Sequence, residues 1–69
     1  MRKEVILFMK NLKSLRLEAG LTQMKLAARV GVSITTIRNW ENGVSDPNEE
    51  NMKKLKQVLQ SELNRNISA

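Results

Sequence analysis

Polar side chains gather on one side of residues 33–42, SITTIRNWEN, when the segment is placed on a helix at about 100° per residue. One arc holds Ile34, Thr35, Arg38, Asn39 and Asn42, and the opposite arc holds Thr36, Ile37, Trp40 and Glu41. An arginine fork and an asparagine amide can each make two parallel hydrogen bonds to a planar edge, such as that of a nucleobase. In isolation, the same two side chains are more typical of a solvated helix face.

The helix that carries this polar arc is predicted to be the second of two short helices joined by a tight turn. Thr22 and Ser33 each suit a helix N-cap, because a hydroxyl oxygen can accept a hydrogen bond from the free amides of the first turn. Gly31 lies between them and can adopt a positive φ at little cost. The spacing therefore predicts helices over residues 23–30 and 34–42, which is the outline of a helix-turn-helix over about 22–42.

Apolar residues at helical spacing extend on both sides of this unit and predict a compact all-α domain of four to five helices. The first helix is expected over residues 9–19, and a last one from about 48 or 49 to 64, which could be one long helix. Trp40 lies opposite the polar arc and is expected in the core. The inward-facing side chains are predicted to be Leu12, Leu15, Ala19, Leu26, Ala27, Val30, Ile37, Trp40, Met52, Leu55, Val58, Leu59 and Leu63.

The two ends of the chain are interpreted separately from the domain at 9–64. Residues 1–8 are expected to be an extension that folding does not need, and residues 65–69 a frayed tail. The start, MRKEVILFM, resembles a signal peptide, but its apolar run is five residues long and Lys10 ends it. No stretch approaches the length of a membrane span, so a cytoplasmic protein with no membrane partner is predicted.

Charge and composition narrow the class of protein. The chain carries a formal net charge of +5, and residues 1–44 hold all of this excess, which favours a polyanionic partner. It has no cysteine and no histidine, so disulfides are excluded, zinc is not expected, and neither a metal nor a cofactor is predicted. With no tyrosine, no glycine-rich phosphate loop and scattered carboxylates, no catalytic residue and no enzyme activity are predicted.

Taken in order, these residues resemble the Cro/CI (XRE) family of helix-turn-helix DNA-binding domains, which have the lambda-repressor-like fold. The match extends from about Met9 to Leu59. The residues that carry it are Leu12, Leu15, Arg16, Gly20, Leu21, Thr22, Gln23, Leu26, Ala27, Gly31, Val32, Ser33, Ile37, Trp40, Glu41, Asn42, Gly43, Pro47 and Leu55. Each element alone is a weak signal, whereas the whole set in register is a strong one.

The resemblance implies a role for each matching polar residue. Base edges would be read by Ile34, Thr35, Arg38 and Asn39, and DNA phosphates would be contacted by Gln23, Ser33, Thr36 and Asn42. Gln23 would also brace the recognition helix, and Arg16 and Glu41 would form an internal ion pair. Ile34 departs from relatives that have glutamine or another polar residue there, so no operator sequence is transferred to this chain.

The function that the resemblance implies is sequence-specific binding of double-stranded DNA by a transcriptional regulator. Relatives act as Cro-like repressors that bind near-palindromic operators as homodimers. Leu55, Leu59, Leu63 and Ile67 could supply the dimer contact, and the alternative is that all of them except Ile67 pack internally. One alternative is the antitoxin of a toxin–antitoxin pair, which would add a toxin protein as partner. Another is a protein-interaction adaptor with the same fold, against which the basic first half and the polar arc argue. RNA binding is disfavoured because the chain lacks the aromatic stacking surface that single-stranded bases need.

Overall fold

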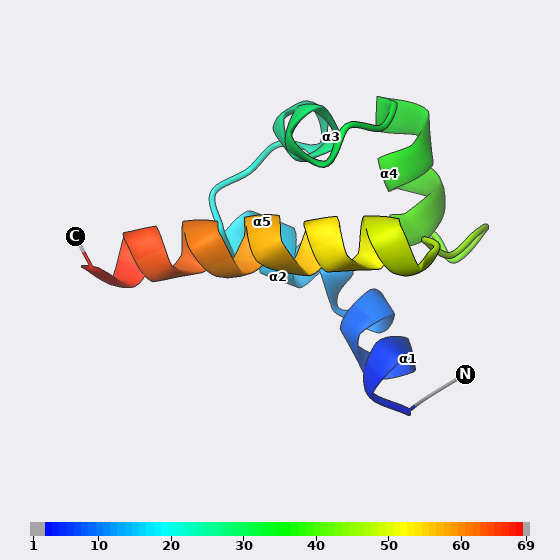
Figure 1. Cartoon of the computed structure of the whole chain (residues 1–69), viewed down its shortest axis with the longest axis horizontal. Coiled ribbons are helices and arrows are strands. Elements are labelled where there is room, and N and C mark those ends of the chain that lie inside the picture. Colours follow the sequence, from blue (N-terminus) through cyan, green and yellow to red (C-terminus); the bar gives the residue numbers. More distant parts are fainter. Residues whose placement is uncertain (1–2, 69) are drawn as a thin grey trace.

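The computed structural model describes the backbone of residues 3–68 and the side chains of residues 3–65. Within these residues the chain forms five helices and no strand: α1 (Lys3–Lys10), α2 (Leu12–Glu18), α3 (Gln23–Val30), α4 (Ile34–Glu41) and α5 (Glu49–Ser68) (Figure 1). The expected all-α domain of four to five helices is therefore confirmed.

The helices α3 and α4 begin where their hydroxyl caps predict. The Oγ1 atom of Thr22 accepts a hydrogen bond from the backbone N–H of Lys25 at 3.0 Å, and Oγ of Ser33 accepts one from the N–H of Thr36 at 3.1 Å. Each cap satisfies one of the amides that the first helical turn leaves without a partner. α4 ends at Glu41, one residue earlier than the expected range.

The chain breaks at Asn11, where one helix over 9–19 was expected, and two helices form instead. Asn11 has φ −101° and ψ 8°, outside helical geometry, and its Nδ2 donates to the carbonyl of Leu7 at 2.9 Å. An asparagine side chain that competes for a backbone carbonyl in this way disfavours continuation of the helix. The chain therefore changes direction between α1 and α2 (Figure 1), and the apolar sides of both helices reach the core.

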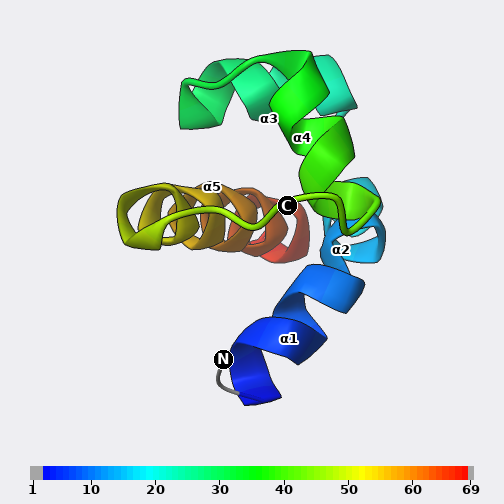
Figure 2. The ribbon, with the colours of Figure 1, turned by 90° about the vertical axis from the view of Figure 1, so that its right-hand side faces the viewer.

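The core lies where the helices meet around α5, which packs against α2 and α3. Seen along α5, the α3–α4 pair lies on one side of this helix and α1 on the other (Figure 2). The buried apolar side chains are Met9, Leu12, Ala19, Leu21, Leu26, Ala27, Val30, Ile37, Trp40, Leu55 and Leu59. Leu15, Met52, Val58 and Leu63, which were also predicted to face inward, are partly buried against this cluster.

α1 belongs to this packing arrangement although it was interpreted as an extension. Met9 is buried, and Val5 and Phe8 are partly buried against the core. The Nζ atom of Lys56, on α5, lies 5.6 Å from the centroid of the Phe8 ring, within the range of a cation–π contact. The proposal that residues 1–8 are dispensable for folding stays a prediction. Because Val5 and Phe8 pack against the core, removal of these residues is expected to lower the stability of the domain.

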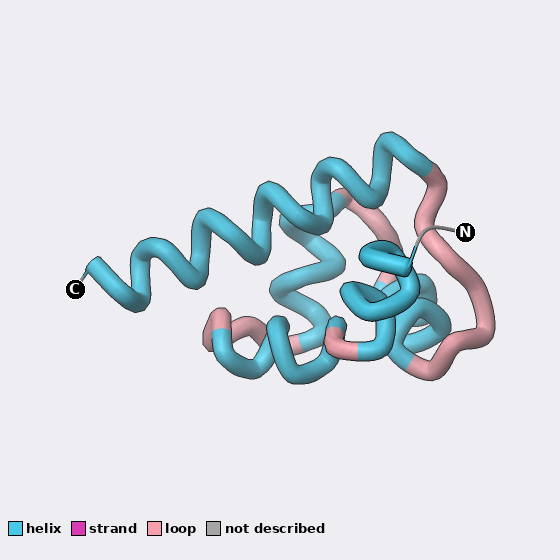
Figure 3. Tube along the Cα trace, turned by 90° about the horizontal axis from the view of Figure 1, so that it is seen from below, coloured by secondary structure: helices cyan, strands magenta, loops and turns pink. Residues whose placement is uncertain are grey.

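α5 is a single helix that continues to Ser68, four residues beyond the expected end at residue 64. Its C-terminal turns extend past the other helices (Figure 3). Leu55 and Leu59 are buried in the core, so the alternative of internal packing holds for these two and a dimer contact through them is excluded. The side chain of Ile67, and the predicted tail residue Ala69, lie outside the described residues. No helix in the described part of the chain has both the length and the apolarity needed to cross a membrane.

Candidate nucleic-acid interface

α4 presents its polar arc to solvent because its other side is anchored in the core. Ile37 is fully buried and Trp40 is 4% exposed, as the two-arc pattern predicts. Thr35 and Arg38 are exposed on the opposite side. The remaining two candidate base-reading residues, Ile34 and Asn39, are half-buried. The four residues thus share a helix whose orientation is fixed by apolar packing.

The turn between α3 and α4 depends on Gly31, which has φ +87°. Its N–H donates to the carbonyl of Ala27 at 2.8 Å, and the N–H of Val32 donates to the same oxygen at 3.0 Å. A Cβ atom built on Gly31 would have no heavy atom within 4 Å, so space does not require glycine here. The left-handed backbone requires it, because other L-residues adopt this conformation only with strain.

The hydroxyl groups of Ser33 and Thr36 lie together at the N-terminus of α4. Their Oγ and Oγ1 atoms are 3.0 Å apart, close enough for one to donate to the other. Helix N-termini carry a partial positive charge and free N–H groups that favour phosphate. Asn42 lies at the other end of the helix, where it is exposed and its backbone N–H donates to the carbonyl of Arg38 at 2.9 Å.

Arg16 and Glu41 form a buried ion pair that joins α2 to α4. Nε of Arg16 donates to Oε2 of Glu41 at 2.6 Å and Nη2 to Oε1 at 3.4 Å, while Nη1 donates to the carbonyl of Leu21 at 2.9 Å. The two side chains are 7% and 3% exposed. A second ion pair joins α3 to α5, between exposed Arg29 and buried Glu62. The helix-turn-helix is therefore held to the rest of the domain by charged contacts as well as by apolar packing.

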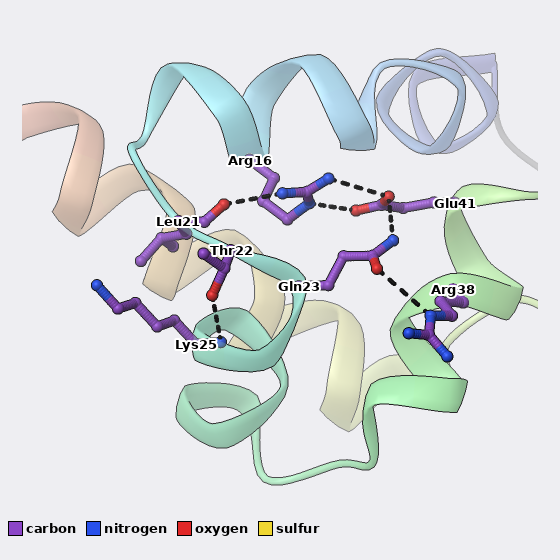
Figure 4. A network of polar contacts seen from close by, with 7 residues as sticks. All are labelled: Arg16, Leu21, Thr22, Gln23, Lys25, Arg38 and Glu41. Carbon is purple, nitrogen blue, oxygen red and sulfur yellow. Dashed lines mark hydrogen bonds and ion pairs between the residues drawn. The ribbon is translucent and has the colours of Figure 1, made fainter.

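Gln23, the first residue of α3, extends the Arg16–Glu41 pair to the protein surface (Figure 4). Its Nε2 donates to Oε1 of Glu41 at 3.1 Å, and its Oε1 accepts from Nε of Arg38 at 3.4 Å. The structure thus brings Gln23 and Arg38 together, a contact that the sequence analysis missed. They lie fifteen positions apart in the sequence, and neither helical periodicity nor capping relates positions on two different helices.

The surface of the helix-turn-helix is free of exposed carboxylates. Glu41 is the only acidic residue between positions 22 and 43, and its side chain is 3% exposed. Lys25 and Arg38 are exposed cations of the same segment. A surface with cationic and neutral polar groups and no exposed carboxylate attracts a polyanion and does not repel it at close range.

Comparison with known protein families agrees with this geometry. The sequence model of the helix-turn-helix family matches residues 12–65, from the first residue of α2 to the last turns of α5. The chain therefore belongs to the helix-turn-helix family of the Cro/CI (XRE) type, a family of DNA-binding domains that are typically non-catalytic. No curated protein and no solved structure matches this chain significantly.

Proposed function

We propose that this domain is a sequence-specific regulator of transcription that inserts α4 into the major groove of double-stranded DNA. The observation that carries the proposal is the exposed polar arc of α4 on a surface without exposed carboxylates. The major groove is about 12 Å wide, so it admits a helix, and it presents a different set of donors and acceptors for each base pair. A helix anchored by Ile37 and Trp40 enters such a groove without reorganising.

Each candidate base-reading side chain suits a particular base edge. Arg38 can donate two hydrogen bonds to O6 and N7 of guanine, and Asn39 can donate to N7 and accept from N6 of adenine. Thr35 can donate, accept, or place its methyl group against thymine. Ile34 makes only apolar contacts, for which the thymine methyl group is the best partner. Its side chain is half-buried, so this contact would involve its exposed part.

The residues around the two ends of α4 fit contacts to the DNA backbone, which position a protein without reading sequence. Ser33 and Thr36 offer hydroxyl groups at its N-terminus, and Asn42 offers an exposed amide at its C-terminus. Gln23 has a second Nε2–H besides the one donated to Glu41, and this hydrogen can serve a phosphate oxygen.

The proposal includes a Cro-like homodimer that binds a near-palindromic operator. Two copies of α4 would then enter successive turns of the major groove, with the centres of the half-sites about 34 Å apart. The formal charge of each protomer, +5, favours association with DNA, although it opposes association of the two protomers in free solution. We therefore expect DNA to promote dimer formation.

Selection from a library of random duplexes, followed by sequencing, tests the proposal. Enrichment of a two-fold-related motif is the expected result, and the double variant Thr35→Ala/Arg38→Ala should lose it. The matched control is Lys53→Ala/Lys54→Ala, which changes two exposed lysines on α5 and should preserve the motif. Weak, salt-sensitive retention of duplexes without an enriched motif would contradict the proposal and favour the antitoxin or adaptor alternatives.

A further inference from the structure

Three hydrogen-bonded side chains connect the buried ion pair to the candidate base-reading surface. Glu41 is 3% exposed, Gln23 is half-buried, and Arg38 is exposed, so the chain Glu41–Gln23–Arg38 leads from the interior to solvent. The carboxylate is fixed by two contacts from Arg16, at 2.6 and 3.4 Å. Its position is therefore set independently of DNA.

The chemistry of the two neighbours of Gln23 determines how its amide is oriented. An ionised carboxylate only accepts hydrogen bonds, and a guanidinium only donates them. The Nε2 group of Gln23 must then face Glu41, and its Oε1 must face Arg38. A flipped amide would place an oxygen against a carboxylate and an N–H group against a cation. Both of these contacts would be repulsive, so Gln23 presents a fixed acceptor to Arg38.

The contact to Gln23 uses only one of the donors of Arg38. Its Nε atom donates to Oε1 of Gln23 at 3.4 Å. The two terminal nitrogens, Nη1 and Nη2, still form a planar fork that fits O6 and N7 of guanine. An unrestrained arginine side chain loses much rotamer freedom when it makes such a contact, and a tethered one loses less.

We propose that Gln23 is a specificity-determining positioning residue, which holds Arg38 so that its Nη1 and Nη2 atoms read guanine end-on. Glu41 acts one step further back by fixing the orientation of the Gln23 amide. This inference rests on the proposed function, and it adds to the phosphate contact of Gln23 an effect on sequence preference. A residue that only binds phosphate weakens all DNA sequences equally, whereas a residue that positions Arg38 changes the preference at one base pair.

The test measures the affinity of purified variants for the selected operator and for duplexes in which each base pair of one half-site is changed in turn. Gln23→Met keeps a side chain of similar length but removes the acceptor for Arg38, together with the Nε2 group that donates to Glu41. It should lower the preference for guanine at the base pair read by Arg38 by about three- to tenfold, the ratio that one hydrogen bond supplies. In an Arg38→Ala background the same change should have no further effect at that base pair.

The matched control is Gln57→Met, the same substitution at an exposed position of α5, which should leave every preference unchanged. A uniform loss of affinity for Gln23→Met, additive with Arg38→Ala, would overturn this inference and leave Gln23 as a phosphate contact alone. A wild-type domain without any base preference would overturn the proposed function and this inference together. An unchanged guanine preference at the Arg38 position in Gln23→Met would overturn the inference while the proposed function stands.

Discussion

The Nε atom of Arg16 and the Oε2 atom of Glu41 lie 2.6 Å apart, with both side chains almost completely removed from solvent. This pair connects α2, the first helix within the family match, to the C-terminal turn of α4. Desolvation offsets much of the attraction within such a pair, so its net contribution to stability is small. Loss of one partner has a large effect, however, because the other charge stays buried alone.

We therefore expect Glu41→Ala to destabilise the domain by about 3–5 kcal/mol. A domain of this size has a total stability of roughly 3–10 kcal/mol, so this loss removes a large fraction of it. Urea denaturation followed by circular dichroism measures the change. The double variant Arg16→Met/Glu41→Met should recover part of the loss, since it removes both charges. Equal stability of the Glu41→Ala variant and the wild type would show that the pair is not buried in solution.

Gly31→Ala should destabilise the domain by about 1–2 kcal/mol, the cost of a left-handed backbone for an L-residue. The absence of any atom near the added Cβ means that this cost comes from the backbone alone. Gly31→Asn should cost less, because asparagine tolerates this conformation better. Thermal unfolding of the two variants checks the order. A larger loss for asparagine than for alanine would show that side-chain volume, and not φ, limits the position.

Arg38→Ala should weaken binding to the selected operator by about 1–3 kcal/mol and relax the preference at one base pair per half-site. Because Arg38 is exposed, the stability of the folded domain should change little. Titration of labelled duplexes at fixed salt measures the affinity. Weakening by the same factor for every duplex would instead assign Arg38 to a phosphate. Lys53→Ala, at an exposed lysine of α5, is the control for loss of charge.

Phe8→Ala should lower stability by about 1.5–2.5 kcal/mol, half the cost at a fully buried phenylalanine, because the ring is only partly buried. A chain that begins at Met9 should fold, as the sequence analysis predicts, but with a larger loss, since Val5 is removed as well. Chemical denaturation of both proteins provides the comparison. Failure of the truncated chain to fold would make residues 1–8 part of the minimal domain. Leu7→Ala, at a 51% exposed position, is the control.

The local signals in the sequence were sufficient to predict the helix-turn-helix. The hydroxyl caps at Thr22 and Ser33 and the left-handed glycine at position 31 act through bonds to residues only a few positions away. The separation of Ile37 and Trp40 from the polar arc follows from helical geometry alone. These features depend on interactions within one helix or one turn, which residue type and spacing determine directly.

The break at Asn11 and the length of α5 were not predicted, for two different reasons. At Asn11 an apolar period of helical type continues through the sequence, while the side chain bonds to the carbonyl of Leu7 and ends the helix. In α5 the residues beyond 64 carry no strong periodic pattern, and the helix continues without a stop signal. In both places the free-energy difference between continuing and ending the helix is small, so residue type and spacing do not determine the outcome.

The sequence by itself determined the family, the two arcs of α4, and the pairing of Arg16 with Glu41 that the resemblance implied. Only the tertiary structure decided between core packing and a dimer contact for Leu55 and Leu59, and showed that Gln23 joins Glu41 to Arg38. Burial and hydrogen bonds between helices depend on how the helices cross. That geometry results from the simultaneous packing of all five helices, so no local pattern of residues encodes it.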